Sequence, residues 1–119
     1  MKVIIAGSRS FNDYDILCKV CDHLLKNQRE VTIISGTAKG ADQLGERYAK
    51  ERNLSVIKFP ADWGTHGKKA GYLRNKEMSN NSDALIAFWD LRSPGTKSMI
   101  ELAREKGLKV KVHLMDLKI

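Results

Sequence analysis

Short apolar runs alternate with longer helical patterns along the whole chain, and this alternation restricts the fold more than any other feature. Five runs have the composition of buried strands: Val3–Ala6, Val31–Ser35, Ser55–Phe59, Ala84–Trp89 and Val110–Leu114. Four stretches between them carry apolar residues at helical spacing: Asp13–Lys26, Ala41–Arg52, Lys68–Ser79 and Thr96–Lys106. Strands that alternate with helices give right-handed crossovers and parallel strands. We therefore predict an α/β, Rossmann-like three-layer sandwich with a mostly parallel five-stranded sheet, in the strand order 3-2-1-4-5.

Length and composition limit the class of protein. The 119 residues fit a single domain, 1–119, with no repeat, linker or low-complexity tract. No apolar run approaches the roughly 20 residues that cross a bilayer. The strand-like start at Val3 leaves no room for a signal peptide. We expect a cytoplasmic protein without a membrane partner. The net charge of +7 favours an anionic partner.

Three glycine-bearing turns stand where strand-like runs end: Gly7-Ser8-Arg9, Ser35 through Asp42, and Ser93 through Thr96. The carboxyl ends of parallel strands lie at one edge of a sheet, and ligands bind in the crevice outside that edge. The predicted strand order puts this crevice between strands one and four. Free N–H groups at helix starts suit phosphate. The turns therefore indicate a site for a nucleotide-like anion.

The charge balance of such a site calls for cationic side chains. Two helix N-termini supply about +1 between them, whereas a phosphate monoester carries about −1.5 to −2. Arg9, at the end of strand one, and Arg74, at the start of the third helical stretch, are the candidates. Asp42 has two interpretations: it complements the helix dipole, or it accepts a hydrogen bond from a sugar hydroxyl.

Aromatic residues near the predicted crevice could stack on a base. Trp63 lies in the irregular stretch from Pro60 to Gly67, Tyr72 follows it, and Trp89 ends the fourth strand. For both tryptophans a place in the core remains the alternative. No paired carboxylates, Ser-His-Asp order or metal-spaced histidine cluster stands out. No catalytic residue, metal or cofactor is assigned from the sequence.

These segments resemble the SLOG superfamily, in particular its small YspA/YpsA-like branch, and they occur in the same order as in that family. The matching pieces cover nearly the whole chain: Gly7-Ser8-Arg9, Ser35–Asp42, Pro60–Trp63, Ala70-Gly71, Arg74-Asn75, Met78, Ala87–Asp90 and Gly95-Thr96. The resemblance implies a Rossmann-like domain that binds nucleotides or nucleotide-derived ligands and that pairs with itself. Relatives include the Lonely Guy phosphoribohydrolases, the DNA-processing protein A fold and sensors of NAD-derived signals.

The chain departs from these relatives at three positions. Thr37 stands where the branch commonly has a second glycine, and Leu91 where a glycine often follows the Trp-Asp pair. The hydrolases carry a Gly-Thr-x-x-Glu motif, in which Met99 replaces the catalytic glutamate here. Glu101 stands two residues further on, about 200° around a helix, so it is expected to point away.

Three functions follow, in order of preference. The first is the sensing or sequestration of a nucleotide or nucleotide-derived second messenger. The second is an N-glycosidic phosphoribohydrolase using Asp42, Asp90 or Glu101. The third is single-stranded DNA binding, disfavoured because no basic stripe is interleaved with aromatic residues. We expect a homo-oligomer. The candidate ligand-binding residues are Gly7, Ser8, Arg9, Ser35, Gly36, Thr37, Lys39, Gly40, Asp42, Trp63, Arg74, Asn75, Trp89, Asp90, Gly95 and Thr96.

Overall fold

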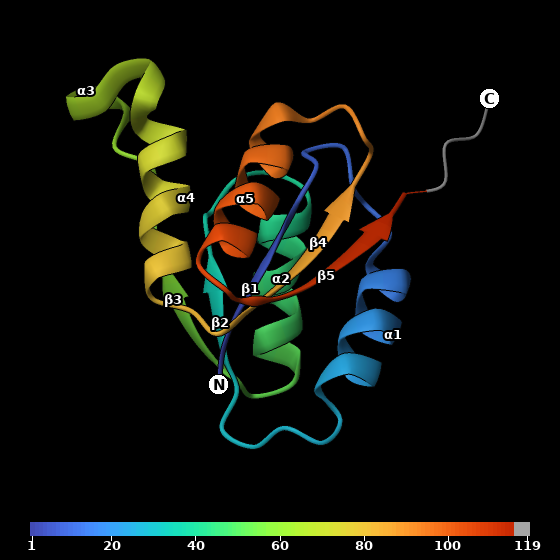
Figure 1. The fold of residues 1–119 in the computed structure, drawn as a ribbon. Helices are drawn as coiled ribbons and strands as arrows, with labels where there is room; N and C mark the ends of the chain where they lie inside the picture. The colour runs from blue at the N-terminus through green and yellow to red at the C-terminus, as the bar shows by residue number, and fades with distance from the viewer. Residues whose placement is uncertain (116–119) are drawn as a thin grey trace.

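The computed structural model describes residues 1–115 and forms a five-stranded sheet with helices on both faces (Figure 1). The strands are β1 (Lys2–Gly7), β2 (Thr32–Ser35), β3 (Ser55–Lys58), β4 (Ala84–Trp89) and β5 (Lys109–Leu114). The helices are α1 (Tyr14–Leu25), α2 (Ala41–Glu51), α3 (Trp63–His66), the 3-10 turn η1 (Gly67–Lys69), α4 (Ala70–Asn80) and α5 (Pro94–Glu105).

All strand pairs are parallel, and the order is β3-β2-β1-β4-β5. This confirms the predicted α/β class and the 3-2-1-4-5 order. The order reverses between β1 and β4, whose residues pair from Val3 with Ala84 to Gly7 with Phe88. Loops that leave these two strands therefore diverge and open a crevice at their carboxyl ends.

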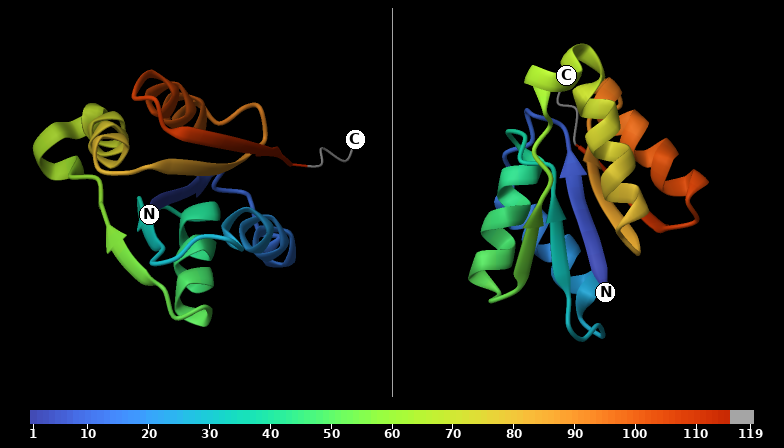
Figure 2. Two further views of the ribbon diagram at one scale, coloured as in Figure 1. Left: turned by 60° about the horizontal axis from the view of Figure 1, so that its bottom comes forward. Right: turned by 90° about the vertical axis from the view of Figure 1, so that its left-hand side faces the viewer.

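Alternate residues of β1 face the two helical layers, as the pleat of a strand requires. Val3 and Ile5 pack with the side of the core that α1 and α2 cover, while Ile4 and Ala6 pack with the side that α5 covers. The two layers are visible in Figure 2. Because β1 is buried on both faces, its sequence is a continuous apolar run rather than an alternating one.

Residues at helix ends match the expectations for helix capping. Asp13 accepts a hydrogen bond from the backbone N–H of Ile16 at 3.1 Å and so caps α1. Pro94 occupies the first turn of α5, where the lack of an N–H costs nothing. Gly107, at φ +78°, follows the end of α5.

The segment predicted to be irregular is partly helical. Asp62 accepts a hydrogen bond from the N–H of Thr65 and thereby caps the single-turn helix α3. Lys68 and Lys69 belong to η1, so α4 starts two residues later than the pattern indicated. Helix α3 is too short for apolar periodicity to reveal it. It projects beyond the sheet at the crevice end (Figure 1).

Within residues 1–115, no helix combines the length and the apolar character that crossing a bilayer requires.

Candidate functional site

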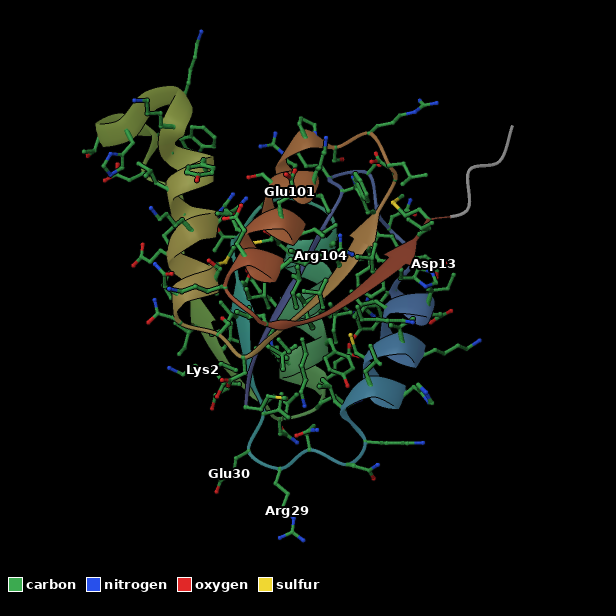
Figure 3. All side chains as sticks on the ribbon, viewed as in Figure 1. Lys2, Asp13, Arg29, Glu30, Glu101 and Arg104 are labelled. Atoms are coloured by element: carbon green, nitrogen blue, oxygen red, sulfur yellow. The ribbon has the colours of Figure 1, made fainter. Side chains whose placement is uncertain are left out.

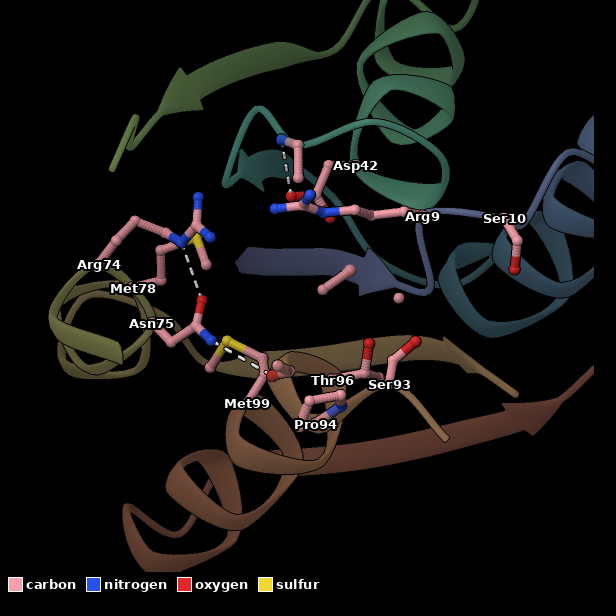
Figure 4. A pocket seen from close by; sticks show the side chains of 14 residues that line it. Arg9, Ser10, Asp42, Arg74, Asn75, Met78, Ser93, Pro94, Thr96 and Met99 are labelled. Atoms are coloured by element: carbon pink, nitrogen blue, oxygen red, sulfur yellow. Dashed lines mark hydrogen bonds between the residues drawn. The ribbon is translucent and has the colours of Figure 1, made fainter. Parts of the chain in front are cut away.

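A cavity of about 450 Å³ lies at the carboxyl ends of β1 and β4. Seven of the sequence-predicted residues line it: Gly7, Arg9, Asp42, Arg74, Asn75, Gly95 and Thr96. They come from four separate parts of the chain and converge at the point where the strand order reverses (Figure 4). A volume of this size is in the range of small-ligand pockets, about 300–1,000 Å³.

Arg74 connects the two sides of the cavity. Its Nη1 donates a hydrogen bond to the carbonyl oxygen of Gly36, in the turn after β2. Its Nε donates to Oδ1 of Asn75 at 2.9 Å, and Nδ2 of Asn75 donates to the carbonyl of Gly95 at 3.3 Å. The position of the guanidinium is thus fixed by the turns after β2 and β4. Burial and the nearby Arg9 lower the pKa of Arg74, and Asp42 opposes that shift.

Arg9 reaches into the same space from the loop after β1. Its side chain is exposed, and its guanidinium extends toward Arg74 (Figure 4). Neither arginine forms an ion pair with a carboxylate among residues 1–115. The cavity therefore holds two guanidinium groups whose charges are not paired within the described part of the chain, which is an arrangement suited to an anion.

Asp42 is the buried carboxyl group of the cavity. Its exposure is 5%, and its Oδ2 accepts a hydrogen bond from the N–H of Ala38 at 3.1 Å. Burial raises the pKa of Asp42 to about 6, although the Ala38 hydrogen bond and the charge of Arg74 act in the opposite direction. The side chain stands in the first turn of α2 and also lines the cavity. Both sequence-based interpretations of Asp42 stay open on this geometry.

Several predicted residues support the turns without lining the cavity. Oγ of Ser8 is buried and accepts hydrogen bonds from the N–H of Asp90 at 3.1 Å and from Oγ of Ser93 at 3.0 Å. Oδ1 of Asp90 accepts from the N–H groups of Arg92 and Ser93, both at 2.8 Å. Nε1 of Trp89 donates to the Ser93 carbonyl at 3.2 Å. These bonds hold the loop before α5.

The turn after β2 is fixed in a similar way. Oγ of the buried Ser35 donates to Oε2 of Glu46 at 2.6 Å and accepts from the N–H of Thr37 at 3.1 Å. The carbonyl of Gly36 is the acceptor for Arg74. Lys39 is exposed, and neither it nor Thr37 lines the cavity. The turn positions Arg74 by a backbone contact.

Gly40 is required by close backbone packing. Its φ is +81°, and a Cβ there would lie 2.4 Å from the carbonyl oxygen of Ser8 and 2.5 Å from that of Arg9. The turns after β1 and β2 therefore pack backbone to backbone, which only glycine permits.

Trp63 lies outside the cavity, on α3. A Cβ built on Gly71 would be 3.5 Å from Cη2 of Trp63 and 4.0 Å from Nη2 of Arg74. The indole and the guanidinium of Arg74, which does line the cavity, therefore both lie near Gly71.

Two apolar residues of the cavity were not among the candidate ligand-binding residues, although the comparison with the SLOG family named both. Met78 and Met99 line the cavity and are buried. Met78 stands four residues after Arg74, and Met99 stands three residues after Thr96. Residues at these spacings share a helix face, so helix periodicity was the signal that could have identified both methionines as lining residues. The other missed lining residues are Ala6, Ser10, Ala38, Ser93 and Pro94.

Met99 occupies the position that a glutamate has in the hydrolase motif. Glu101 is exposed and does not line the cavity, as the helix geometry predicted (Figure 3).

Sequence comparison places the chain in a family. The family model described as "YspA, cpYpsA-related SLOG family" matches residues 1–66, more than half of the chain. The chain belongs to this SLOG family. A similar protein is the gene 61 protein of Mycobacterium phage D29, which is 34% identical over 116 residues that cover 92% of this chain and 93% of that protein.

Two solved structures share the SLOG fold of this chain. DNA processing protein A from Streptococcus pneumoniae superposes with a TM-score of 0.74 at 22% identity, over 93% of this chain and 49% of that one. DNA processing protein A from Helicobacter pylori gives 0.69 at 22% identity, over 94% of this chain and 64% of that one. The chain thus spans about half to two thirds of these proteins.

One expectation about partners is wrong. Nucleic acid was disfavoured, yet DNA processing protein A from Helicobacter pylori, whose fold is similar to that of this chain, binds single-stranded DNA. The earlier ranking relied on the lack of basic residues among aromatic ones. In the fold, Trp63, Lys68, Lys69 and Tyr72 are all exposed on the segment that carries α3 and the start of α4.

Proposed function

We propose that the crevice binds single-stranded DNA by holding one backbone phosphate between Arg9 and Arg74. The observation that carries this proposal is the convergence of two guanidinium groups on one cavity, with no ion pair to residues 1–115. A guanidinium fork matches the geometry of phosphate oxygens. Arg74 is held by two hydrogen bonds before any ligand arrives, so little side-chain entropy is lost on binding.

The start of α5 adds to the positive potential. Gly95 and Thr96, in its first turn, line the cavity, and a helix N-terminus contributes about half a positive charge. With the Asp42 carboxylate ionised at neutral pH, two arginines and this terminus still leave a charge of about +1.5, which balances the single negative charge of a phosphodiester. The net charge of +7 supports association with a longer polyanion.

The likeness to DNA processing protein A supports the same proposal at the level of the fold.

A free nucleotide or nucleotide-derived messenger is the second candidate. The buried Asp42 favours it, because a carboxylate at the wall of a cavity of about 450 Å³ can accept a hydrogen bond from a sugar hydroxyl. DNA lacks the 2′-hydroxyl, so this contact would select a ribonucleotide.

The test is fluorescence anisotropy with a labelled oligothymidylate of about 12 nucleotides. We expect binding that weakens steeply between about 50 and 200 mM salt. Arg9→Ala combined with Arg74→Ala should lower the affinity at least about 10-fold and reduce the salt slope by about 0.7, the amount that one neutralised phosphate of a single strand contributes.

The control is Arg29→Ala, which removes one positive charge, against two in the double variant, from an exposed site at the end of the sheet away from the crevice (Figure 3). Its affinity should stay close to that of the wild type. If the protein does not bind the oligonucleotide at low salt, but its melting temperature rises when a ribonucleotide is added, the second candidate function is favoured over the first.

A further inference from the structure

Two large aromatic side chains are exposed on one segment beside the crevice. Trp63 is 54% exposed and Tyr72 51% exposed. They belong to residues 63–73, which we name the α3–α4 arm; it comprises α3, η1 and the first turn of α4. An exposed aromatic face is available for stacking on a nucleobase.

The arm is in direct continuity with the crevice. Gly71 separates the tip of the Trp63 ring from Nη2 of Arg74, and both groups lie within van der Waals range of the position that a Cβ would occupy. A nucleotide with its phosphate at Arg74 would therefore have Trp63 beside its sugar and base.

The charge of the arm suits a nucleic acid. Between Asp62 and Glu77 the sequence contains no acidic residue. Lys68 and Lys69 are exposed on η1, and Arg74 follows at the crevice. The carboxylate of Asp62 accepts a hydrogen bond from the N–H of Thr65 and caps α3. Phosphates that follow the arm would thus meet Lys68, Lys69 and Arg74 and no acidic residue between positions 63 and 76.

We propose that Trp63 is a stacking platform for the nucleobase next to the phosphate at Arg74, with Lys68 and Lys69 contacting the adjoining backbone. This rests on the single-stranded DNA binding proposed above. Stacking on an aromatic face tolerates any base, because every base has a π-face. The arm would bind single strands in preference to duplex DNA, whose bases are already stacked.

The experiment compares two labelled strands of equal length, an oligothymidylate and an abasic oligonucleotide with the same phosphates. The wild type should bind the oligothymidylate more tightly than the abasic strand by about 5- to 150-fold, the range of one stacked base. Trp63→Ala should bind the two strands almost equally, with the salt slope unchanged. Trp63→Phe should restore part of the difference. Because Trp63 is exposed, the melting temperatures of both variants should match that of the wild type.

Each outcome decides between the proposals. If the wild type binds neither strand at low salt, both the proposed DNA binding and the proposed stacking on Trp63 are wrong. If it binds but Trp63→Ala keeps the preference for bases, only the platform falls. A Trp63→Ala variant that keeps this preference and changes from dimer to monomer in sedimentation would make the arm an interface between two copies of the chain.

Discussion

Arg74 ties α4 to the turn after β2, because its Nη1 donates a hydrogen bond to the carbonyl oxygen of Gly36. The same guanidinium donates from Nε to Asn75, so Nε and Nη1 are bound to protein acceptors, whereas Nη2 lies 4.0 Å from the position that a Cβ on Gly71 would occupy. The arginine therefore has a structural part in closing the crevice wall besides its charge.

Replacing Arg74 by lysine separates these two contributions. Lysine keeps the charge but lacks the planar fork, so it cannot bond Gly36 and Asn75 while contacting a phosphate. We expect Arg74→Lys to lower the affinity for oligothymidylate about 10-fold, because a hydrogen bond to a charged group contributes a free energy of about that size. The salt slope should stay unchanged, because the charge is kept. Anisotropy titrations at several salt concentrations measure both quantities.

Arg104→Lys, at the exposed last turn of α5, is the matched control and should behave as the wild type (Figure 3). Equal affinities for Arg74→Lys and the wild type would mean that only the charge of Arg74 contributes.

The regular part of the fold could be predicted from the sequence, since alternating apolar runs determine strands, crossovers and, with the economical strand order, the place of the crevice. The roles of individual polar residues could not. Ser8, Ser35 and Asp90 have the same residue types as ligand-binding side chains, and only the three-dimensional contacts reveal that their oxygens bond to the protein itself. Helix α3 was missed because one capped turn carries no periodicity.

The two departures from the glycine pattern of the family are positions of backbone strain. Thr37 and Leu91 both have φ +66°, in the left-handed region that glycine occupies readily. A non-glycine residue there costs about 1–2 kcal/mol. Glycine would adopt this backbone conformation without strain at both positions, whereas Thr37 and Leu91 adopt it at a cost in free energy.

Leu91→Gly should therefore stabilise the protein. Leu91 is 54% exposed, so little burial is lost. Glycine also has a greater entropy in the unfolded state, which costs about 0.4–1 kcal/mol and reduces the gain from relieved strain. The free energy of unfolding should therefore rise by about 0.5 kcal/mol, as measured by urea denaturation. Leu91→Ala keeps the Cβ and should show no gain. If alanine stabilises as much as glycine, the strain is not the cause.

Gly40→Ala should be severely destabilising. A methyl group there would overlap the carbonyl oxygens of Ser8 and Arg9 in a backbone with φ +81°. Since backbone cannot move aside cheaply, we expect a loss of about 3 kcal/mol or more, seen as a lower urea midpoint. Gly95→Ala serves as the control because nothing lies within 4 Å of its Cβ position, and its stability should be almost unchanged. Equal losses in both variants would contradict the packing argument.

The pH dependence of stability should reveal the buried Asp42. Its pKa is raised to about 6 by burial, above the value of about 3.9 in an unfolded chain. The folded state therefore binds more protons than the unfolded state between these values, and the contribution of Asp42 to stability falls as pH rises from about 4 to about 6. The pKa values of Asp22, Glu51, Asp62 and Asp90 are lowered, so these groups act in the opposite direction.

Asp42→Asn isolates this contribution, since asparagine can still accept the hydrogen bond from Ala38. Relative to the wild type, the variant should gain stability as pH rises from 4 to 7, by about 2 kcal/mol at neutral pH. Urea denaturation at a series of pH values measures the difference. Asp62→Asn, which removes a carboxylate with a lowered pKa, should show the reverse trend. A difference between Asp42→Asn and the wild type that stays constant with pH would mean that the Asp42 carboxyl group is as well solvated in the folded crevice as in the unfolded chain.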